Sequence, residues 1–216
     1  MLNEDRERMV ATQIEARGIT DPLVLAAMRA VPREQFVPAA LARFAYEDRP
    51  LPIGEGQTIS QPYIVAVMTQ AAGLKPGARA LEIGTGSGYG AAVLSRIAAE
   101  VYTVERVGLL AEEARDRLAR LGYPTVHVLE GDGTLGWAEH APYDAIVVTA
   151  AGPRVPGALL SQLAAGGRLI MPVGSGSHHQ RLVRVTRTET QEYRYEDLEE
   201  VAFVPLIGAE GWTEGG

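Results

Sequence analysis

The residues most suited to binding a ligand are a run of glycines and two acidic residues that follow it along the chain. Residues 84–90 read GTGSGYG, and glycines of this kind let backbone N–H groups approach a ligand closely. Glu105 follows at about the 20-residue offset at which a carboxylate meets ribose hydroxyls in nucleotide-binding α/β domains. Asp132 stands between two glycines, where it can accept a hydrogen bond from an adenine amine. Together these residues predict a pocket for an adenosine group.

Each signal also has a structural alternative. The glycines could serve only a tight turn, Glu105 could be a solvated strand end, and Asp132 could close an Asx turn. An NAD-dependent oxidoreductase is disfavoured because its fingerprint needs a small third residue where this chain has Tyr89. The coincidence of the three signals indicates adenosine without a pyrophosphate, and S-adenosylmethionine has that shape. A binding module that has lost catalysis would carry the same residues.

A parallel sheet is needed to bring these residues together. Apolar runs alternate with helical patterns from Arg79 onward, which is typical of a parallel sheet covered on both faces. Strands are expected over residues 80–83, 101–104, 126–129, 145–149 and 168–172, and a helix over 109–121. Residues 181–188 and 200–206 should add an antiparallel edge. Ligands of such sheets bind beyond the carboxyl ends of the strands, where the strand order reverses.

The remaining segments define the expected organisation. Residues 1–76 form an N-terminal helical region with a ligand-binding loop, residues 77–208 the α/β domain, and residues 209–216 a frayed tail. Helices are expected from Pro22, after the capping side chain of Asp21, over residues 38–45, and from Pro62 to Gly73. Residues 49–61 are rich in proline and glycine and predict a loop.

Composition limits the classes of function. The chain has 216 residues, of which 46% are hydrophobic and 22% charged, as in ordinary globular proteins. A net charge of -7 disfavours nucleic acid as a partner, and the absence of cysteine excludes a thiol nucleophile. No signal peptide or membrane segment is readable, so a cytoplasmic monomer without a membrane partner is expected.

Several longer motifs resemble a known family. The segments LEIGTGSGYGAAVLS, VYTVER, EGDG and YDAIVVTAAG resemble successive cofactor-binding motifs of methyltransferases. GQTISQPYIVAVMTQ, over residues 56–70, is similar to the signature of the protein-L-isoaspartate O-methyltransferases, and DPLVLAAMRAVPREQFVP and VAFVPLIG also match. The resemblance covers the chain from about Met9 to Gly208.

The resemblance implies a class I methyltransferase-like Rossmann fold and S-adenosyl-L-methionine as cofactor. It implies methylation of the free α-carboxyl of L-isoaspartyl residues in damaged proteins and peptides. The methyl ester that forms would then close to a succinimide, which is the first stage of repair. Such a carboxyl has a pKa of about 3.3–3.9, so it is ionised at neutral pH and needs no general base. The alternative is a methyltransferase that acts on RNA or a small molecule.

The resemblance also assigns residues to roles. The cofactor-binding residues are expected to be Thr58, Ile59, Ser60, Gly84, Thr85, Gly86, Gly88, Glu105, Arg106, Asp132, Gly133 and Thr149. The substrate-binding residues are expected to be Ile53, Thr58, Ser60, Val204, Pro205 and Leu206. Ser60 is placed beside the reacting groups as the catalytic residue, at a helix start that favours an anion.

Two of these assignments, and the role of Trp137, have purely structural alternatives. Ser60 or Gln61 could simply cap a helix, and residues 204–206 could form a buried edge strand rather than pair with a peptide. Trp137 could border the adenine or merely pack. No metal is expected, since His178 and His179 without a nearby carboxylate are more typical of a solvated loop.

Overall fold

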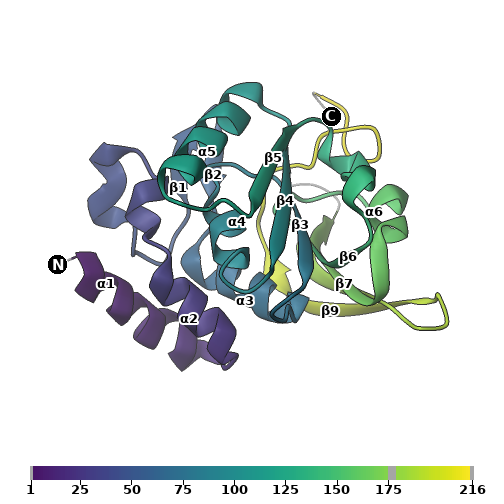
Figure 1. The fold of residues 1–216 in the computed structure, drawn as a ribbon, viewed down its shortest axis with the longest axis horizontal. Coiled ribbons are helices and arrows are strands. Elements are labelled where there is room, and N and C mark those ends of the chain that lie inside the picture. The colour runs from purple at the N-terminus through teal and green to yellow at the C-terminus, as the bar shows by residue number, and fades with distance from the viewer. Residues whose placement is uncertain (1, 175–178, 215–216) are drawn as a thin grey trace.

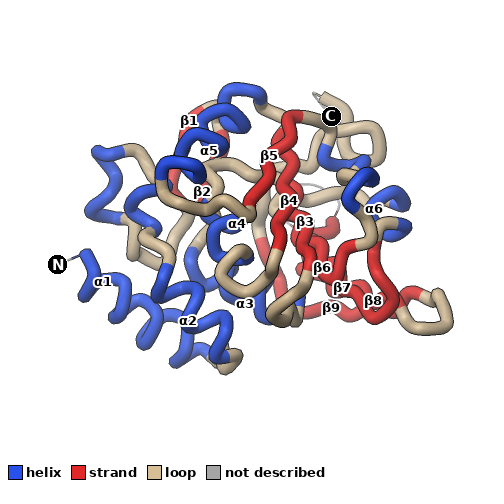
Figure 2. The backbone as a smooth tube through the Cα atoms, viewed as in Figure 1, coloured by secondary structure: helices blue, strands red, loops and turns tan. Residues whose placement is uncertain are grey.

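A seven-stranded sheet with the order β5-β4-β3-β6-β7-β8-β9 forms the centre of the computed structural model, which describes residues 2–174 and 179–214 (Figures 1 and 2). The strands are β3 (Arg79–Ile83), β4 (Glu100–Glu105), β5 (Val126–Glu130), β6 (Tyr143–Val148), β7 (Leu163–Gly174), β8 (Gln180–Arg187) and β9 (Tyr193–Val201). Strands β3 to β7 pair in parallel, and β8 and β9 are antiparallel. The predicted doubly wound sheet is confirmed, and its order reverses between β3 and β6.

Helices cover both faces of this sheet. Those of the α/β region are α3 (Pro62–Ala72), α4 (Tyr89–Leu94), α5 (Gly108–Arg120) and α6 (Gly157–Ser161), with short 3-10 helices at Gly133–Leu135 and Ala138–His140. The sheet has a hydrophobic core on each face, and alternate side chains of β3 point into one or the other. Ala80 packs with α3 and α4, whereas Leu81 and Ile83 pack with Leu159 of α6. No helix in the described ranges is long and apolar enough to cross a membrane.

The N-terminal region lies beside α3 and is mostly helical (Figure 1). It comprises α1 (Leu2–Met9), a π-helical turn (Val10–Ile14), α2 (Pro22–Ala30) and 3-10 helices at Glu15–Arg17, Arg33–Phe36 and Ala39–Phe44. The helix predicted from Pro22 is confirmed, since the Asp21 carboxylate accepts a hydrogen bond from the Leu23 N–H at 2.8 Å. The helix predicted from Pro62 is also confirmed, and it ends at Gly73 in the left-handed region.

The prediction of a loop over residues 49–61 is wrong. Strands β1 (Leu51–Gly54) and β2 (Gln57–Ile59) form an antiparallel hairpin there. Glu55 and Gly56 connect them with φ values of +50° and +68°, which is the geometry of a tight two-residue turn that matches strand twist. The hairpin holds Thr58 and Ile59 in a fixed register.

The last predicted strand is misplaced. The edge strand β9 covers residues 193–201, whereas residues 203–206 cross the sheet ends and reach Ala151. The difference arises because β9 is largely exposed and rich in charge, so its sequence lacks the apolar run of a buried strand. Pro205 also lacks the N–H that a ladder position needs.

The described part of the predicted tail, residues 209–214, is docked rather than frayed. The Ala209 N–H donates to the Asp132 carboxylate at 2.7 Å, and the Trp212 indole N–H donates to the Ala151 carbonyl at 3.0 Å. These bonds hold a tight turn against the ends of β5 and β6, where the binding residues were predicted.

Candidate functional site

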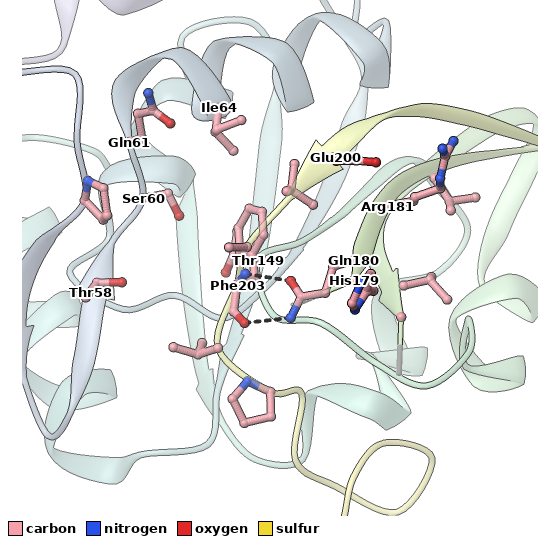
Figure 3. A pocket seen from close by; sticks show the side chains of 18 of the residues that line it. Thr58, Ser60, Gln61, Ile64, Thr149, His179, Gln180, Arg181, Glu200 and Phe203 are labelled. Carbon is pink, nitrogen blue, oxygen red and sulfur yellow. Dashed lines mark hydrogen bonds between the residues drawn. The ribbon is translucent and has the colours of Figure 1, made fainter. Parts of the chain in front are cut away.

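Two cavities adjoin the carboxyl ends of the parallel strands. The small cavity has a volume of about 250 Å³ and lies against the loops after β3, β4 and β6. The large cavity has a volume of about 1140 Å³ and lies between the start of α3 and strands β8 and β9 (Figure 3). Residues that line both are Thr58, Thr149, Val204 and Pro205. These four residues, the shared wall, are therefore where ligands of the two cavities would meet.

The glycine loop forms one side of the small cavity. Gly84 has a φ of +93°, and a Cβ atom added there would lie 2.3 Å from the Thr149 hydroxyl. That hydroxyl lies 3.0 Å from the Ile83 carbonyl and 2.9 Å from the Gly84 carbonyl, to which it can donate. A Cβ atom at Gly133 would lie 2.4 Å from the Ile83 side chain. The glycines thus let bare backbone form the cavity surface.

Glu105 ties two loops together at the rim of the small cavity. Its side chain is 7% exposed, and its carboxylate accepts hydrogen bonds from Gly86 N–H at 2.8 Å and Val107 N–H at 3.0 Å. Each carboxylate oxygen has a second lone pair for a further donor. The carboxylate can therefore hold the glycine loop and a diol at the same time.

A second acid lies fully buried behind the glycine loop. Glu82 accepts a hydrogen bond from the Thr103 hydroxyl at 2.7 Å, and Thr103 lies 2.7 Å from the Thr85 hydroxyl. Burial raises the pKa of Glu82 to about 8, because the loss of solvation outweighs the hydrogen bond from Thr103. Thr85 therefore supports the loop from behind, and it does not line either cavity.

The raised pKa of Glu82 predicts a pH-dependent stability. Its pKa rises from 4.5 to about 8 on folding, so its contribution is fully present below the unfolded value and is lost as pH rises through about 8. The melting temperature of Glu82→Gln minus that of the unsubstituted chain should therefore increase between about pH 5 and pH 8. Thermal scans at several pH values measure this difference. Glu139→Gln, a substitution of an exposed glutamate, is scanned alongside as the control, and a Glu82→Gln difference that stays constant with pH would contradict the prediction.

The carboxylate of Asp132 accepts hydrogen bonds from other residues of the protein. One carboxylate oxygen accepts from the backbone and hydroxyl of Thr134 at 2.8 and 2.7 Å, and the other accepts from Ala209 N–H at 2.7 Å. Burial alone would raise the pKa of Asp132, but these hydrogen bonds lower it. Asp132 does not line either cavity, so its part in adenine binding stays a prediction.

The structure brings together most of the predicted cofactor-binding residues. Those that line the small cavity are Thr58, Gly84, Gly86, Glu105, Arg106, Gly133 and Thr149. Ile59 and Gly88 lie behind it: Ile59 is buried in the hairpin, and Gly88 is the N-cap of α4. Arg106 also pairs with Glu214 at 2.6 Å, which ties the C-terminal turn to the cavity rim.

The predicted substrate residues lie near the large cavity with two exceptions. Ser60, Thr58, Val204 and Pro205 line it, whereas Leu206 lines only the small cavity. Ile53 lines neither cavity. Its side chain lies beside Gly86, 3.1 Å from where a Cβ atom added to that glycine would stand.

The alternative role of Ser60 or Gln61 as a helix cap is not what the structure shows. α3 begins after Gln61 without any side-chain cap bond, and the Gln61 amide donates to the Asp48 carbonyl at 3.1 Å. Ser60 thus lies at the helix start and lines the large cavity without capping the helix.

Several lining residues were missed by the sequence analysis. The small cavity also includes Gly56, Gln57, Val107 and Ile207, and the large one Gln61, Ile64, Gln180, Arg181 and Phe203. Gln57, Gln61 and Ile207 lie within the quoted family motifs, so their position could have flagged them. Gln180 and Arg181 carry no spacing signal.

The histidines and Trp137 have structural surroundings. Trp137 and His140 pack against Tyr102, so the indole belongs to an aromatic cluster of the sheet. His179 lines the large cavity, and His178 lies outside the described residues. Among residues 2–174 and 179–214, no group of three or more His, Asp or Glu side chains is placed to hold a metal ion.

The small cavity fits an adenosyl group. Its apolar walls come from Ile83, Val104, Leu206 and Ile207, and its one buried carboxylate is Glu105. Apolar surfaces suit a purine, and a carboxylate suits two ribose hydroxyls. A doubly wound sheet with this cavity at its reversal point is the arrangement of a nucleoside-binding α/β domain.

Comparisons with known proteins place the chain within that class. The family model for protein-L-isoaspartate(D-aspartate) O-methyltransferase matches residues 4–211. Protein-L-isoaspartate O-methyltransferase 2 of Pelobacter propionicus is 63% identical over 207 residues, covering 96% of this chain and 92% of the relative. The chain belongs to the protein-L-isoaspartate(D-aspartate) O-methyltransferase family.

Solved structures agree with this membership. A protein-L-isoaspartate O-methyltransferase aligns with a TM-score of 0.85 at 32% identity, over 95% of this chain and 67% of that chain. A Plasmodium falciparum protein described as a beta-aspartate methyltransferase, in complex with S-adenosyl-L-homocysteine, aligns with a TM-score of 0.81 at 26% identity. That alignment covers 94% of this chain and 98% of the other. The predicted family and fold class are confirmed.

Proposed function

We propose that this chain methylates the free α-carboxyl of L-isoaspartyl residues in damaged proteins and peptides, with S-adenosyl-L-methionine as methyl donor. The observation that carries the proposal is the shared wall between a cavity of nucleoside size and a cavity large enough for a peptide segment. Membership of the family supports the choice of substrate. The ester product would close to a succinimide, so the enzyme starts repair.

The chemistry demands positioning more than acid or base catalysis. When bound, S-adenosyl-L-methionine supplies a methyl group attached to a positively charged sulfur. An ionised carboxylate oxygen must lie about 3–3.5 Å from that carbon, in line with the bond that breaks. Because the carboxyl is already ionised at neutral pH, the side chains need to orient it and exclude water.

The residues of the two cavities divide these tasks. Glu105 would accept hydrogen bonds from the ribose hydroxyls. Arg106 and the backbone of the glycine loop would form the rest of the nucleoside site. Thr58 and Thr149 would border the methyl group from the shared wall. Ile59, Thr85 and Gly88 would support this arrangement from behind, and Asp132 would accept a hydrogen bond from the adenine amine.

On the substrate side, Ser60 would orient the carboxylate at the N-terminus of α3, where backbone N–H groups favour an anion. The backbone of Val204 and Pro205 would border the peptide. Leu206 and Ile53, which do not line the large cavity, would contribute to substrate binding by supporting this wall.

Ser60→Ala should lower turnover without loss of the nucleoside. Loss of one oriented hydrogen bond to the carboxylate is expected to reduce kcat by about 10- to 100-fold, equivalent to about 1.5–3 kcal/mol. Calorimetry with S-adenosylhomocysteine should give an unchanged Kd. If Ser60→Ala lowered only the melting temperature, a structural role for Ser60 would be the better account.

A matched pair of peptides tests the proposed substrate. Methyl incorporation is measured with an isoaspartyl peptide and with its aspartyl twin of the same sequence. Labelling of the isoaspartyl peptide alone is the expected result. Equal labelling of both peptides, or none of either, would refute the proposed function.

A further inference from the structure

The chain segment that carries two residues of the shared wall crosses the sheet with little strand pairing of its own. The β8–β9 ladder ends at the pair Gln180 and Val201, and the chain then passes over the ends of β8 and β7. It is next held at Ala151, whose N–H donates to the Val204 carbonyl at 2.8 Å and whose carbonyl accepts from Leu206 N–H at 2.7 Å. The segment between these two anchors contains Phe203.

The side chain of Gln180 provides the partner for Phe203. Its carboxamide oxygen accepts from Phe203 N–H at 2.6 Å, and its amide nitrogen donates to the Phe203 carbonyl at 3.0 Å (Figure 3). Two directly opposed residues of an antiparallel ladder exchange the same two hydrogen bonds, one in each direction. Gln180 is only 4% exposed, so water does not readily replace these bonds.

We propose that Gln180 is a positioning residue for the reaction, because its carboxamide replaces a strand partner of Phe203 and so sets the backbone that presents Val204 and Pro205 at the shared wall. The inference rests on the proposed function. Gln180 lines only the large cavity, whereas the Ala151 bonds hold the same segment toward the small one. Its loss should therefore affect the peptide more than the nucleoside.

The requirement is chemically narrow. A carboxamide offers one acceptor and one donor in the same plane, as Phe203 demands. An ionised glutamate has the same shape but places a second oxygen against the Phe203 carbonyl, and methionine fills the volume with neither group. A protonated glutamate again offers one acceptor and one donor.

The test compares Gln180→Met and Gln180→Glu with the unsubstituted enzyme. At pH 7.5 or so, the KM for the isoaspartyl peptide should rise about ten-fold or more in both variants, because Gln180→Glu loses one of the two hydrogen bonds to Phe203 and Gln180→Met loses both. Kd for S-adenosylhomocysteine should change by less than about two-fold, since the bonds to Ala151 remain. Gln35→Met, at an exposed position that lines neither cavity, is the matched control.

A pH profile separates positioning from general structural support. Burial should favour the neutral form of the carboxyl introduced by Gln180→Glu as pH falls, so the KM of this variant should approach that of the unsubstituted enzyme near pH 5.5 or so. Gln180→Met should keep its defect. The titratable and charged groups that also line the cavity are common to all variants; they are His179, Arg181, Asp197 and Glu200. The ratio of the KM of each variant to that of the unsubstituted enzyme is therefore compared at each pH.

Each outcome decides the inference. Unchanged KM in both variants, or a parallel loss of S-adenosylhomocysteine affinity and melting temperature, would overturn it. If the unsubstituted enzyme did not label the peptide, the proposed function would fail instead. Crystal structures of Gln180→Met would then still decide the positioning role, because a backbone at residues 203–205 that has not moved would overturn it.

Discussion

Gly84→Ala should weaken binding of S-adenosylhomocysteine by about 100-fold or more. The left-handed backbone adds a strain of about 1–3 kcal/mol, and overpacking against the Thr149 hydroxyl adds a similar amount. The loop would have to move away from Thr149, and its backbone would leave the cavity wall. Titration calorimetry measures the loss directly.

Two variants control for this effect. Gly122→Ala introduces alanine at a φ of +78° with no atom within 4 Å of the new Cβ, so it tests strain without a clash. It should lower the melting temperature and leave the Kd unchanged. Gly84→Ala combined with Thr149→Ala should regain part of the affinity, since the next Thr149 atom lies 3.7 Å away. Full affinity in Gly84→Ala alone would contradict the cavity assignment.

Glu105→Ala should also reduce the affinity by about 100-fold, because it removes the acceptor for the ribose and leaves two N–H groups unmet, each worth about 1–3 kcal/mol. The groups left unmet are those of Gly86 and Val107. Glu130→Ala is the matched control, since it removes an exposed acid from the paired end of β5.

A deoxyribose analogue of S-adenosylhomocysteine separates the two causes. The unsubstituted enzyme should bind the analogue more weakly than the parent compound, whereas Glu105→Ala should bind both equally. An equal penalty in both proteins would mean that Glu105 acts only by holding the loops.

The sheet was predictable where its strands are buried on both faces. Strands such as β3 and β6 consist of continuous apolar runs, which are visible without any structure. Strand β9 faces solvent and carries several acidic residues, so its sequence pattern resembles that of a loop. The hairpin was hidden because Glu55, a residue that rarely adopts positive φ, occupies its turn.

The site was predictable where its chemistry is local in sequence. The glycine loop and Glu105 follow strand ends at regular offsets, and the structure brings them to one cavity. Asp132 could be located but not its partner, because Ala209 lies 77 residues further along the chain. Gln180 acts on a backbone group through its side chain, and no spacing rule marks such a contact.

The small cavity has a consequence for how the molecule matures. Its walls include the hairpin residues 56–58 and the crossing residues 204–207, which lie far apart in the sequence. A polypeptide still emerging from the ribosome lacks the later wall. A nucleoside bound in this cavity, as proposed, would therefore stabilise only a fold in which both segments are in place.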